Sequence, residues 1–433
     1  MRSSLLVLVC VALTATSAFS QKPTPTPDDD VVRISTNLIQ VDVSVTDRKG
    51  DPVTDLKPNE VEVYENGQRQ TITNFSFISG LRQAASAVPS NVPGVSVPPV
   101  PLRPEQVHRT IALVVDDLAL SMESTYYVRR ALKKFVEEQM QPGDLVAIIR
   151  TGAGIGALQQ FTSDKRMLYA AIDKVKWNPS GTGGVTAFAP IETDPNTAPT
   201  PDDNGDVPGA TGGQSLESFR STVFSIGTLG ALKYVVGGMS ALPGRKSVIL
   251  FSDGFKLFEK DENGNQADSQ VLDFLRVLTD TANRAAVTFY TVDPRGLQFT
   301  GFTAADKVGD TDPDAMNSAR QERSDQLRDT QDGLRYLAEE TGGFAIINTN
   351  DISGGVKKVL DDQSYYLIAY TPDADTFDPK KPKFNQLAVR VLRPGLKVRY
   401  RSGFFNVADK ERVATAPDRR TPAQQLTDAL TSP

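Results

Sequence analysis

The sequence predicts an α/β protein with a doubly wound, mostly parallel sheet and a smaller antiparallel β part. Residues 111–115 (IALVV) and 248–251 (VILF) are apolar without alternation, which is typical of strands covered by helices on both faces. Asp116 and Asp117 follow the first run, and Asp253 follows the second. Because parallel sheets bind ligands at the carboxyl ends of their strands, we expect these acids to share one crevice.

Length and composition indicate a globular protein. A chain of 433 residues is long enough for about three domains of ~150 residues each. Hydrophobic residues make up 39% of the sequence, so large cores can form. The net charge is −6, with acids and bases interspersed. This balance lacks the basic patch of a nucleic-acid-binding protein, and we expect no nucleic-acid partner.

Residues 1–20 are typical of a secretory signal peptide, with Arg2 before the apolar LLVLVCVAL and a small-residue cleavage site ending at Ser20. Cys10 is the only cysteine, and the bulky Val9 before it does not fit a lipoprotein signal. The mature chain would therefore have neither disulfides nor thiolate metal sites. We expect export to the periplasm or the cell exterior. We expect no transmembrane segment, because no later window reaches ~18 apolar residues.

After a Pro/Thr/Asp tether at residues 21–30, residues 31–79 are predicted to form an antiparallel β unit. Apolar and polar residues alternate from 38 to 46, and Asn66-Gly67 marks a turn between two further strands. Such a unit has a thin core and needs a packing partner. Residues 80–108, rich in Pro, Ser and Ala, are predicted to be a linker.

Residues 109–362 are predicted to form the α/β domain, in which strands alternate with helices. Its predicted helices are 122–140, 163–177, 216–241, 268–284, 325–341 and 352–362, and its later strands are 144–150, 286–293 and 344–348. A hairpin is expected around Gly152, Gly154 and Gly156, and a polar excursion at 295–323. The Gly/Pro/Thr/Asp-rich loop 178–214 far exceeds ordinary connections, as functional or disordered loops do.

Alternation returns in residues 363–406, and residues 407–433 are polar and predicted to be disordered. The units 31–79 and 363–406 are each too small to form a core. We therefore expect them to share one β-sandwich, with the α/β domain inserted between them.

Three segments together resemble a von Willebrand factor A domain: the strand, acids and loop at 111–121, the Gly/Thr-rich loop at 181–186, and the Ser-Asp-Gly at 252–254. The stretches PGRKSVILFSDGF and YYLIAY…RSGFF are similar, more narrowly, to secreted proteins related to this domain in acidobacteria. The resemblance covers residues 31–406. It is more specific for the fold than for activity.

The resemblance implies a metal-ion-dependent adhesion site. The family uses an Asp-x-Ser-x-Ser loop, a Thr from a second loop and an Asp from a third. Mg²⁺, or Mn²⁺ or Ca²⁺ in its place, suits such oxygen ligands and leaves a position for an acidic group of a protein partner. By this resemblance Ser121 and Thr186 would contact the metal, and Asp117 and Asp253 would hold it directly or through water. Thr182 is an alternative to Thr186.

The motif is incomplete in this chain. Alignment on Ser121 matches Asp117 but places Ala119 where the family has its first serine. Alignment on Asp116 replaces both serines by leucines. A vestigial site is therefore an alternative interpretation, in which Asp117 and Asp253 only satisfy backbone amides and helix N-termini. Asp293 is interpreted as a turn former before Pro294.

The sequence favours binding over catalysis. His108 is the only histidine, which excludes zinc sites built on several histidines and leaves one residue for any Ser-His-Asp triad. We expect a non-enzymatic exported module that captures an acidic group of a protein partner. The alternatives are a structural envelope component with a decayed metal site and, less favoured, a Mg²⁺-dependent hydrolase.

Overall fold

The computed structural model describes residues 38–79, 106–153, 160–191, 209–243, 245–260, 266–306, 313–373, 376 and 383–406. The predicted signal peptide, the tether, most of the linker 80–108 and the tail 407–433 lie outside the described residues. The middle of the long loop, 192–208, lies outside them as well.

Five parallel strands form the central sheet, in the order β11-β10-β7-β5-β6. Their bounds are β5 Arg109–Val115, β6 Asp144–Arg150, β7 Arg245–Phe251, β10 Val287–Val292 and β11 Ala345–Ile346. β5 and β10 are buried at every position, as expected for strands covered on both faces. β5 lies between β6 and β7, so the winding direction reverses at its carboxyl end, where such sheets bind ligands.

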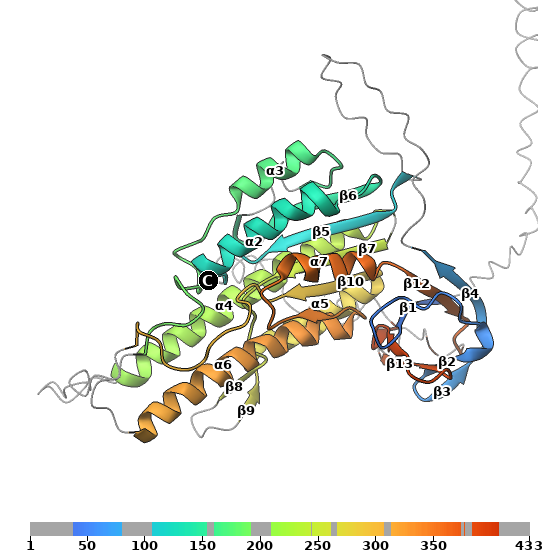
Figure 1. Cartoon of the computed structure of the whole chain (residues 1–433). Coiled ribbons are helices and arrows are strands. Elements are labelled where there is room, and N and C mark those ends of the chain that lie inside the picture. The colour runs from blue at the N-terminus through green and yellow to red at the C-terminus, as the bar shows by residue number, and fades with distance from the viewer. Residues whose placement is uncertain are drawn as a thin grey trace, which may run out of the picture. The chain divides into compact units, whose positions relative to one another are not determined.

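Helices cover both faces of this sheet (Figure 1). One face packs against α2 (Met122–Lys134) with its π-helical extension Phe135–Gln139, α3 (Lys165–Lys174) and α7 (Ile352–Asp361). The other packs against α4 (Gly209–Met239), α5 (Gln270–Arg284) and α6 (Pro313–Glu340). Successive residues of β5 alternate between the two cores: Ile111 and Leu113 belong to the first, and Ala112 to the second. The predicted α/β class, with a parallel sheet between helices, is confirmed.

Several predicted boundaries were wrong. α6 begins at Pro313 instead of residue 325, so residues 313–323 of the predicted polar excursion are helix. Few side chains in the first half of α6 are buried, so no apolar period marked it. α4 begins at Gly209 instead of 216, and α3 ends at Lys174 instead of 177. The short antiparallel pair β8 (Phe258–Lys260) and β9 (Gln266–Asp268) was not predicted.

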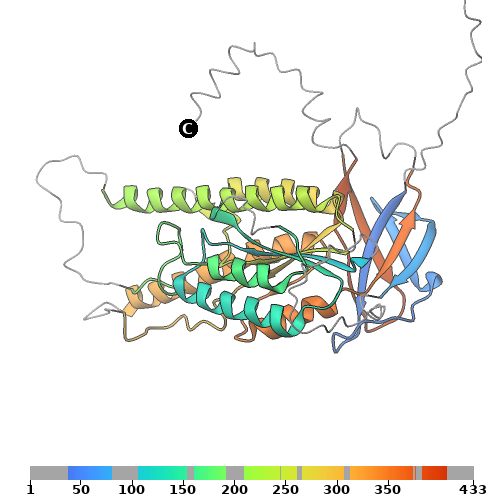
Figure 2. The ribbon, with the colours of Figure 1, turned by 90° about the horizontal axis from the view of Figure 1, so that it is seen from above.

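Two antiparallel sheets form the second part of the fold, with strand orders β14-β1-β12-β4 and β15-β13-β2-β3. The N-terminal strands are β1 Ile39–Thr46, β2 Val61–Glu65, β3 Gln68–Gln70 and β4 Ile72–Ile78, with a 3-10 turn at Pro58–Glu60. The C-terminal strands are β12 Tyr365–Tyr370, β13 Phe384–Val391, β14 Lys397–Arg399 and β15 Gly403–Phe405. Each sheet therefore pairs strands from both ends of the described chain, as Figure 2 shows in blue and orange.

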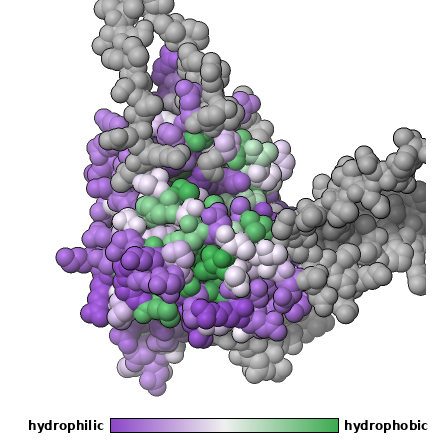
Figure 3. Space-filling model, turned by 90° about the vertical axis from the view of Figure 1, so that its right-hand side faces the viewer, coloured by the Kyte–Doolittle hydropathy of each residue, from purple (hydrophilic) through white to green (hydrophobic). Residues whose placement is uncertain are grey.

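One core lies between these two sheets. Val41 of β1 is opposite Ile368 of β12, and Val63 of β2 is opposite Val389 of β13. All four side chains belong to one apolar cluster. On the outside, Figure 3 shows a small apolar area among polar side chains on the side of the molecule that it faces. Two short sets of strands are stable here because they bury each other.

Polar side chains join this sandwich to the amino ends of the parallel strands. Arg245, the first residue of β7, is 9% exposed and places its guanidinium 4.4 Å from the centre of the Tyr365 ring. Its Nη2 lies 3.4 Å from both Ser44 Oγ and Tyr290 Oη. The Tyr290 hydroxyl donates to Asp362 at 2.9 Å, and Asp362 pairs with Arg399. The sandwich therefore contacts the sheet edge opposite to the acids that follow β5 and β7.

We expect Ile368→Ala to lower the free energy of unfolding by roughly 2–5 kcal/mol, because Ile368 is fully buried in the shared core. Leu392→Ala is the control, since Leu392 is 59% exposed and its loss is expected to change stability by less than about 0.5 kcal/mol. Urea unfolding measures both values. Equal effects of the two substitutions would contradict the shared core.

Candidate functional site

Asp116 connects four segments at the carboxyl end of β5. Its side chain is 1% exposed and accepts hydrogen bonds from Thr228 Oγ1 of α4 (2.6 Å), Ser252 Oγ after β7 (2.7 Å) and Thr151 Oγ1 after β6 (3.1 Å). Burial raises the pKa of Asp116, and the three hydroxyl donors oppose that rise. Asp116 is thus a buried anchor of the sheet edge.

Asp117 faces the β6 side of the same edge. One of its oxygens accepts the Gly152 N–H at 2.7 Å and lies 3.3 Å from Thr151 Oγ1. The other lies 3.5 Å from an Arg150 guanidinium nitrogen. A carboxylate with these contacts is held by the protein itself. A cation that used Asp117 directly would have to compete with Arg150.

Asp253 and Ser121 are brought together, as the sequence predicted. Asp253 Oδ2 accepts the Ser121 N–H at 2.9 Å. Ser121 is the N-cap of α2, and its Oγ accepts the Ser124 N–H at 3.1 Å and lies 2.9 Å from Ser124 Oγ. Both serines are 1% exposed. A carboxylate and two hydroxyls therefore meet at the N-terminus of a helix.

The second oxygen of Asp253, Oδ1, is buried without a hydrogen-bond partner among the described residues. Burial raises the pKa of Asp253 to about 6, and Asp293 adds to the rise, whereas Arg295, the Ser121 N–H and the Ser124 hydroxyl oppose it. A buried carboxylate oxygen without a hydrogen-bond donor is stabilised either by protonation or by a bound cation.

The Gly/Thr-rich loop lies against the start of α2. The backbone N–H groups of Met122 and Glu123 donate to the carbonyls of Gly184 (2.9 Å) and Val185 (3.1 Å). A Cβ on Gly183 would collide with the Leu120 carbonyl, so only glycine allows this approach. The three segments of the predicted site therefore converge.

The two candidate threonines of this loop differ in their contacts. Thr186 is exposed, and its hydroxyl donates to the Phe188 carbonyl at 2.7 Å. Thr182 instead donates both its N–H (2.8 Å) and its hydroxyl (3.3 Å) to the Leu118 carbonyl. Both threonines are exposed, and each hydroxyl donates to a carbonyl and keeps lone pairs for an outside ligand.

An ion pair holds this loop to the loop after β10. Asp306 pairs with Arg323 of α6 at 2.6 Å and also accepts the Ile191 N–H at 2.7 Å. Arg323 in turn donates to the carbonyls of Ala189 (2.8 Å) and Gly301 (3.0 Å). Arg323 keeps the pKa of Asp306 well below its usual range. Two long loops are thereby tied together beside the strand ends.

Asp293 accepts the Arg295 N–H at 3.1 Å across Pro294, a turn contact of the kind expected for it. Its carboxylate is fully buried, pairs with Arg295 at 2.8 Å and accepts from Gln331 at 2.8 Å.

The sequence analysis missed the hydroxyls around Asp116 and the part played by Ser124. Thr228 stands alone as a polar residue in the apolar stretch 226–232, which is a signal for a buried hydrogen bond. Ser124 carries no such signal, because serine is common in the first turn of a helix.

The donor chemistry fits a hard cation only in part. Carboxylate and hydroxyl oxygens from Asp253, Ser121 and Ser124 are ligands that Mg²⁺ accepts. Across the described residues, however, no three His, Cys, Asp or Glu side chains gather as a metal-binding group. A cation here would keep several water ligands.

Comparisons with known proteins add little. No protein-family model matches the chain, and no curated protein matches it. Among solved structures, an aerotolerance-related membrane protein from Bacteroides fragilis with multiple mutations to serines is 13% identical; the match covers 59% of this chain and 98% of that chain, with a TM-score of 0.30. An uncharacterized membrane spanning protein from Vibrio fischeri is 16% identical with the same coverages and a TM-score of 0.15. At these TM-scores the likeness says nothing about the site.

Helix α4 bears on the membrane prediction. Within the described residues, Phe219–Met239 is long and apolar enough to cross a bilayer by length and composition, and 33% of its apolar window is buried. Leu229, Leu232 and Val236 of this stretch pack in the core beside the sheet. Core helices of soluble proteins pass the same test, so the absence of a transmembrane segment stays a prediction.

We expect Thr228→Val to destabilise the protein by about 1–3 kcal/mol, because it removes the shortest hydrogen bond to the buried Asp116 carboxylate. The control is Thr281→Val on the surface of α5, where the hydroxyl donates to the Val277 carbonyl. Thermal unfolding at neutral pH compares the two. Equal stabilities of the two variants would show that Asp116 does not need its Thr228 donor.

We expect Asp253→Asn to change how stability depends on pH in the presence of EDTA. The folded pKa of about 6 lies above the ordinary value of 3.8, so the folded state binds the proton more tightly. Stability of the wild type should therefore fall as pH rises from about 4 to about 6, by at most ~3 kcal/mol. The variant should lack this fall and be the more stable protein at pH 8.

Chemical unfolding across this pH range provides the measurement. Asp329→Asn, at an exposed position of α6, is the control and should keep the wild-type slope. Identical pH profiles for wild type and Asp253→Asn would refute the raised pKa.

Proposed function

We propose that this chain is a binding module of the von Willebrand factor A type, exported by its N-terminal segment. In this proposal a divalent cation at the carboxyl ends of β5 and β7 captures an acidic side chain of a protein partner. The observation that carries the proposal is the buried Asp253, whose Oδ1 lacks a hydrogen-bond partner among the described residues and whose Oδ2 accepts the N–H of Ser121 at the start of α2.

A cation would supply what this oxygen lacks. Asp253 would contribute its Oδ1, and Ser121 would contribute its hydroxyl oxygen, which now interacts with Ser124. Mg²⁺ keeps water ligands readily, so few protein ligands suffice, and Mn²⁺ or Ca²⁺ accepts the same oxygens. The Lewis acidity of the bound cation would attract the partner's carboxylate.

Asp117 and Thr186 have supporting parts in this proposal. Asp117 already contacts Arg150 and the Gly152 N–H, so it would act on the cation through water. Thr186 would use the lone pairs of its exposed hydroxyl. The Ala119 side chain has no oxygen, so water would fill one more coordination position of the cation.

Exposed apolar side chains near the site favour a protein partner. Met122 (52% exposed) and Val185 (60%) come from α2 and the loop that caps it. Leu297 (69%) and Phe299 (68%) come from the loop after β10, which Arg323 ties to the capping loop. Large apolar side chains around a polar centre are typical of protein-binding surfaces.

The second candidate function is a structural envelope component with a vestigial metal site. The contacts of Asp117 with Arg150 and Gly152 favour it, because they satisfy that carboxylate without a metal. A Mg²⁺-dependent hydrolase has no comparable support.

We expect Mg²⁺ or Mn²⁺ to raise the melting temperature of the wild type at pH 7.5. A cation at 100 times its dissociation constant stabilises the folded state by about 2.7 kcal/mol. Asp253→Ala should abolish the shift and Ser121→Ala should reduce it. Ser318→Ala, on the exposed side of α6, should leave it unchanged.

Differential scanning fluorimetry with and without EDTA measures these shifts. A wild type that responds to no divalent cation would support the structural alternative. If metal binds, an immobilised chain should retain a partner from envelope extract that EDTA releases.

A further inference from the structure

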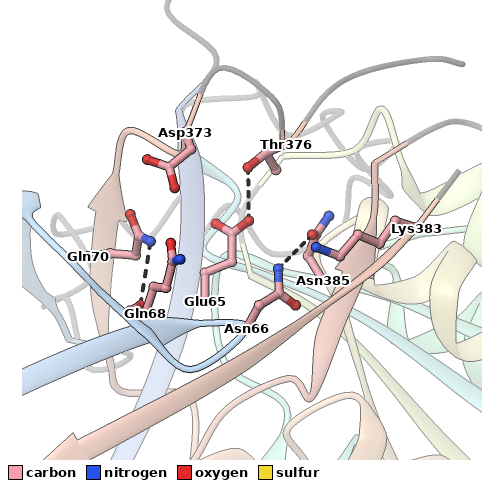
Figure 4. Close-up of a pocket in the computed structure, with 8 residues that line it drawn as sticks. All are labelled: Glu65, Asn66, Gln68, Gln70, Asp373, Thr376, Lys383 and Asn385. Atoms are coloured by element: carbon pink, nitrogen blue, oxygen red, sulfur yellow. Dashed lines mark hydrogen bonds between the residues drawn. The ribbon is translucent and has the colours of Figure 1, made fainter. Parts of the chain in front are cut away.

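A second polar site lies in the β-sandwich, where the β2–β3 turn meets the segments that follow β12 and precede β13 (Figure 4). It is a pocket of about 150 Å³. All eight side chains that line it are polar or charged. Drug-sized apolar ligands occupy pockets of roughly 300–1,000 Å³, so this one suits a single small polar molecule.

A buried carboxylate lies in the middle of the pocket. Glu65 is 4% exposed and accepts hydrogen bonds from Tyr370 Oη (2.7 Å) and Thr376 Oγ1 (3.0 Å). Burial and the neighbouring Glu65 raise the pKa of Tyr370, so its hydroxyl stays a donor. Each oxygen of Glu65 therefore has one donor in place and a further lone pair available to a ligand.

A buried donor group lies beside this acceptor. Asn385 is 1% exposed, and its Oδ1 accepts from Asn66 Nδ2 at 2.9 Å. The Gln386 N–H holds Asn66 in turn, at 3.1 Å from Asn66 Oδ1. The Nδ2 group of Asn385 is buried and makes no hydrogen bond to any described residue. A buried amide without an acceptor is unfavourable, and a ligand oxygen would satisfy it.

The remaining lining side chains carry both kinds of hydrogen-bonding group. Gln68 and Gln70 bring amides from β3, Asp373 brings a second carboxylate, and Lys383 brings an ammonium group (Figure 4). The two carboxylates and the one ammonium leave one net negative charge. Because the lining both donates and accepts hydrogen bonds, it suits a ligand whose groups also do both.

We propose that this pocket binds one monosaccharide unit, with sugar hydroxyls donating to Glu65 and accepting from the Asn385 amide. A hydroxyl group both donates and accepts, so a ring with several hydroxyls can satisfy both sets of protein groups. A metal ion is disfavoured because the Lys383 ammonium lines the pocket and the Asn385 amide needs an acceptor, which a cation does not provide. An apolar ligand is disfavoured by the wholly polar lining.

The test is isothermal titration calorimetry of the full chain with glucose, galactose, mannose and N-acetylglucosamine. We expect saturable binding of at least one sugar. Glu65→Gln preserves the side-chain shape and should weaken binding by about tenfold, equivalent to one lost hydrogen bond of 1.4 kcal/mol. Gln70→Ala at the half-buried rim should weaken it without a folding defect, and Gln40→Ala, at an exposed position of β1, is the matched control.

Three outcomes would overturn the proposal: no heat of binding for any of these sugars at tens of millimolar, binding that both pocket variants leave unchanged, or a response to Ca²⁺ or free amino acids in place of sugars. Thermal unfolding of each variant without sugar separates weakened binding from misfolding. Because the pocket does not use Asp253 or Ser121, Asp253→Ala should bind the sugar as the wild type does. The cation site and the sugar pocket can therefore fail independently.

Discussion

A buried carboxylate constrains the whole carboxyl edge of the parallel sheet. Asp116 follows the central strand β5 and receives hydroxyls from α4, from the end of β7 and from the end of β6. An ionised group at this depth is tolerated only when its oxygens are satisfied, so these segments must all reach it together. That requirement places Ser252 at Asp116, and therefore Asp253 at the start of α2.

The sheet separates two regions with different chemistry. At the amino ends of the strands, Arg245 and Asp362 join the sheet to the sandwich through buried polar contacts. At the carboxyl ends, backbone turns and long loops surround Ser121 and Asp253, and the loops are held by the Asp306–Arg323 pair. The candidate cation site and the polar pocket at Glu65 thus belong to different parts of the fold, each supported by its own contacts.

The sequence predicted that both acids after β5 lie at the sheet edge, but not which contacts each of them makes. Asp116 and Asp117 are neighbours, and the motif alignment favoured Asp117 as the metal-holding residue. In the structure both side chains are buried and both contact the Thr151 hydroxyl, but Asp116 also accepts from Thr228 and Ser252, whereas Asp117 contacts Gly152 and Arg150. Thr228 and Ser252, which distinguish the two acids, lie far away in the sequence.

The sequence alone determined the parallel sheet and the convergence of its loops. Unbroken apolar runs at 111–115 and 248–251 require cover on both faces, and acids that end such strands must meet at one edge. The start of α6 was not predicted, because few of its side chains are buried and no apolar period marks it. Only the tertiary structure decided that Asp253 retains a buried oxygen without a described donor and that Asn385 retains a buried amide. Whether a polar atom is satisfied depends on distances between distant segments, and spacing along a chain does not contain those distances.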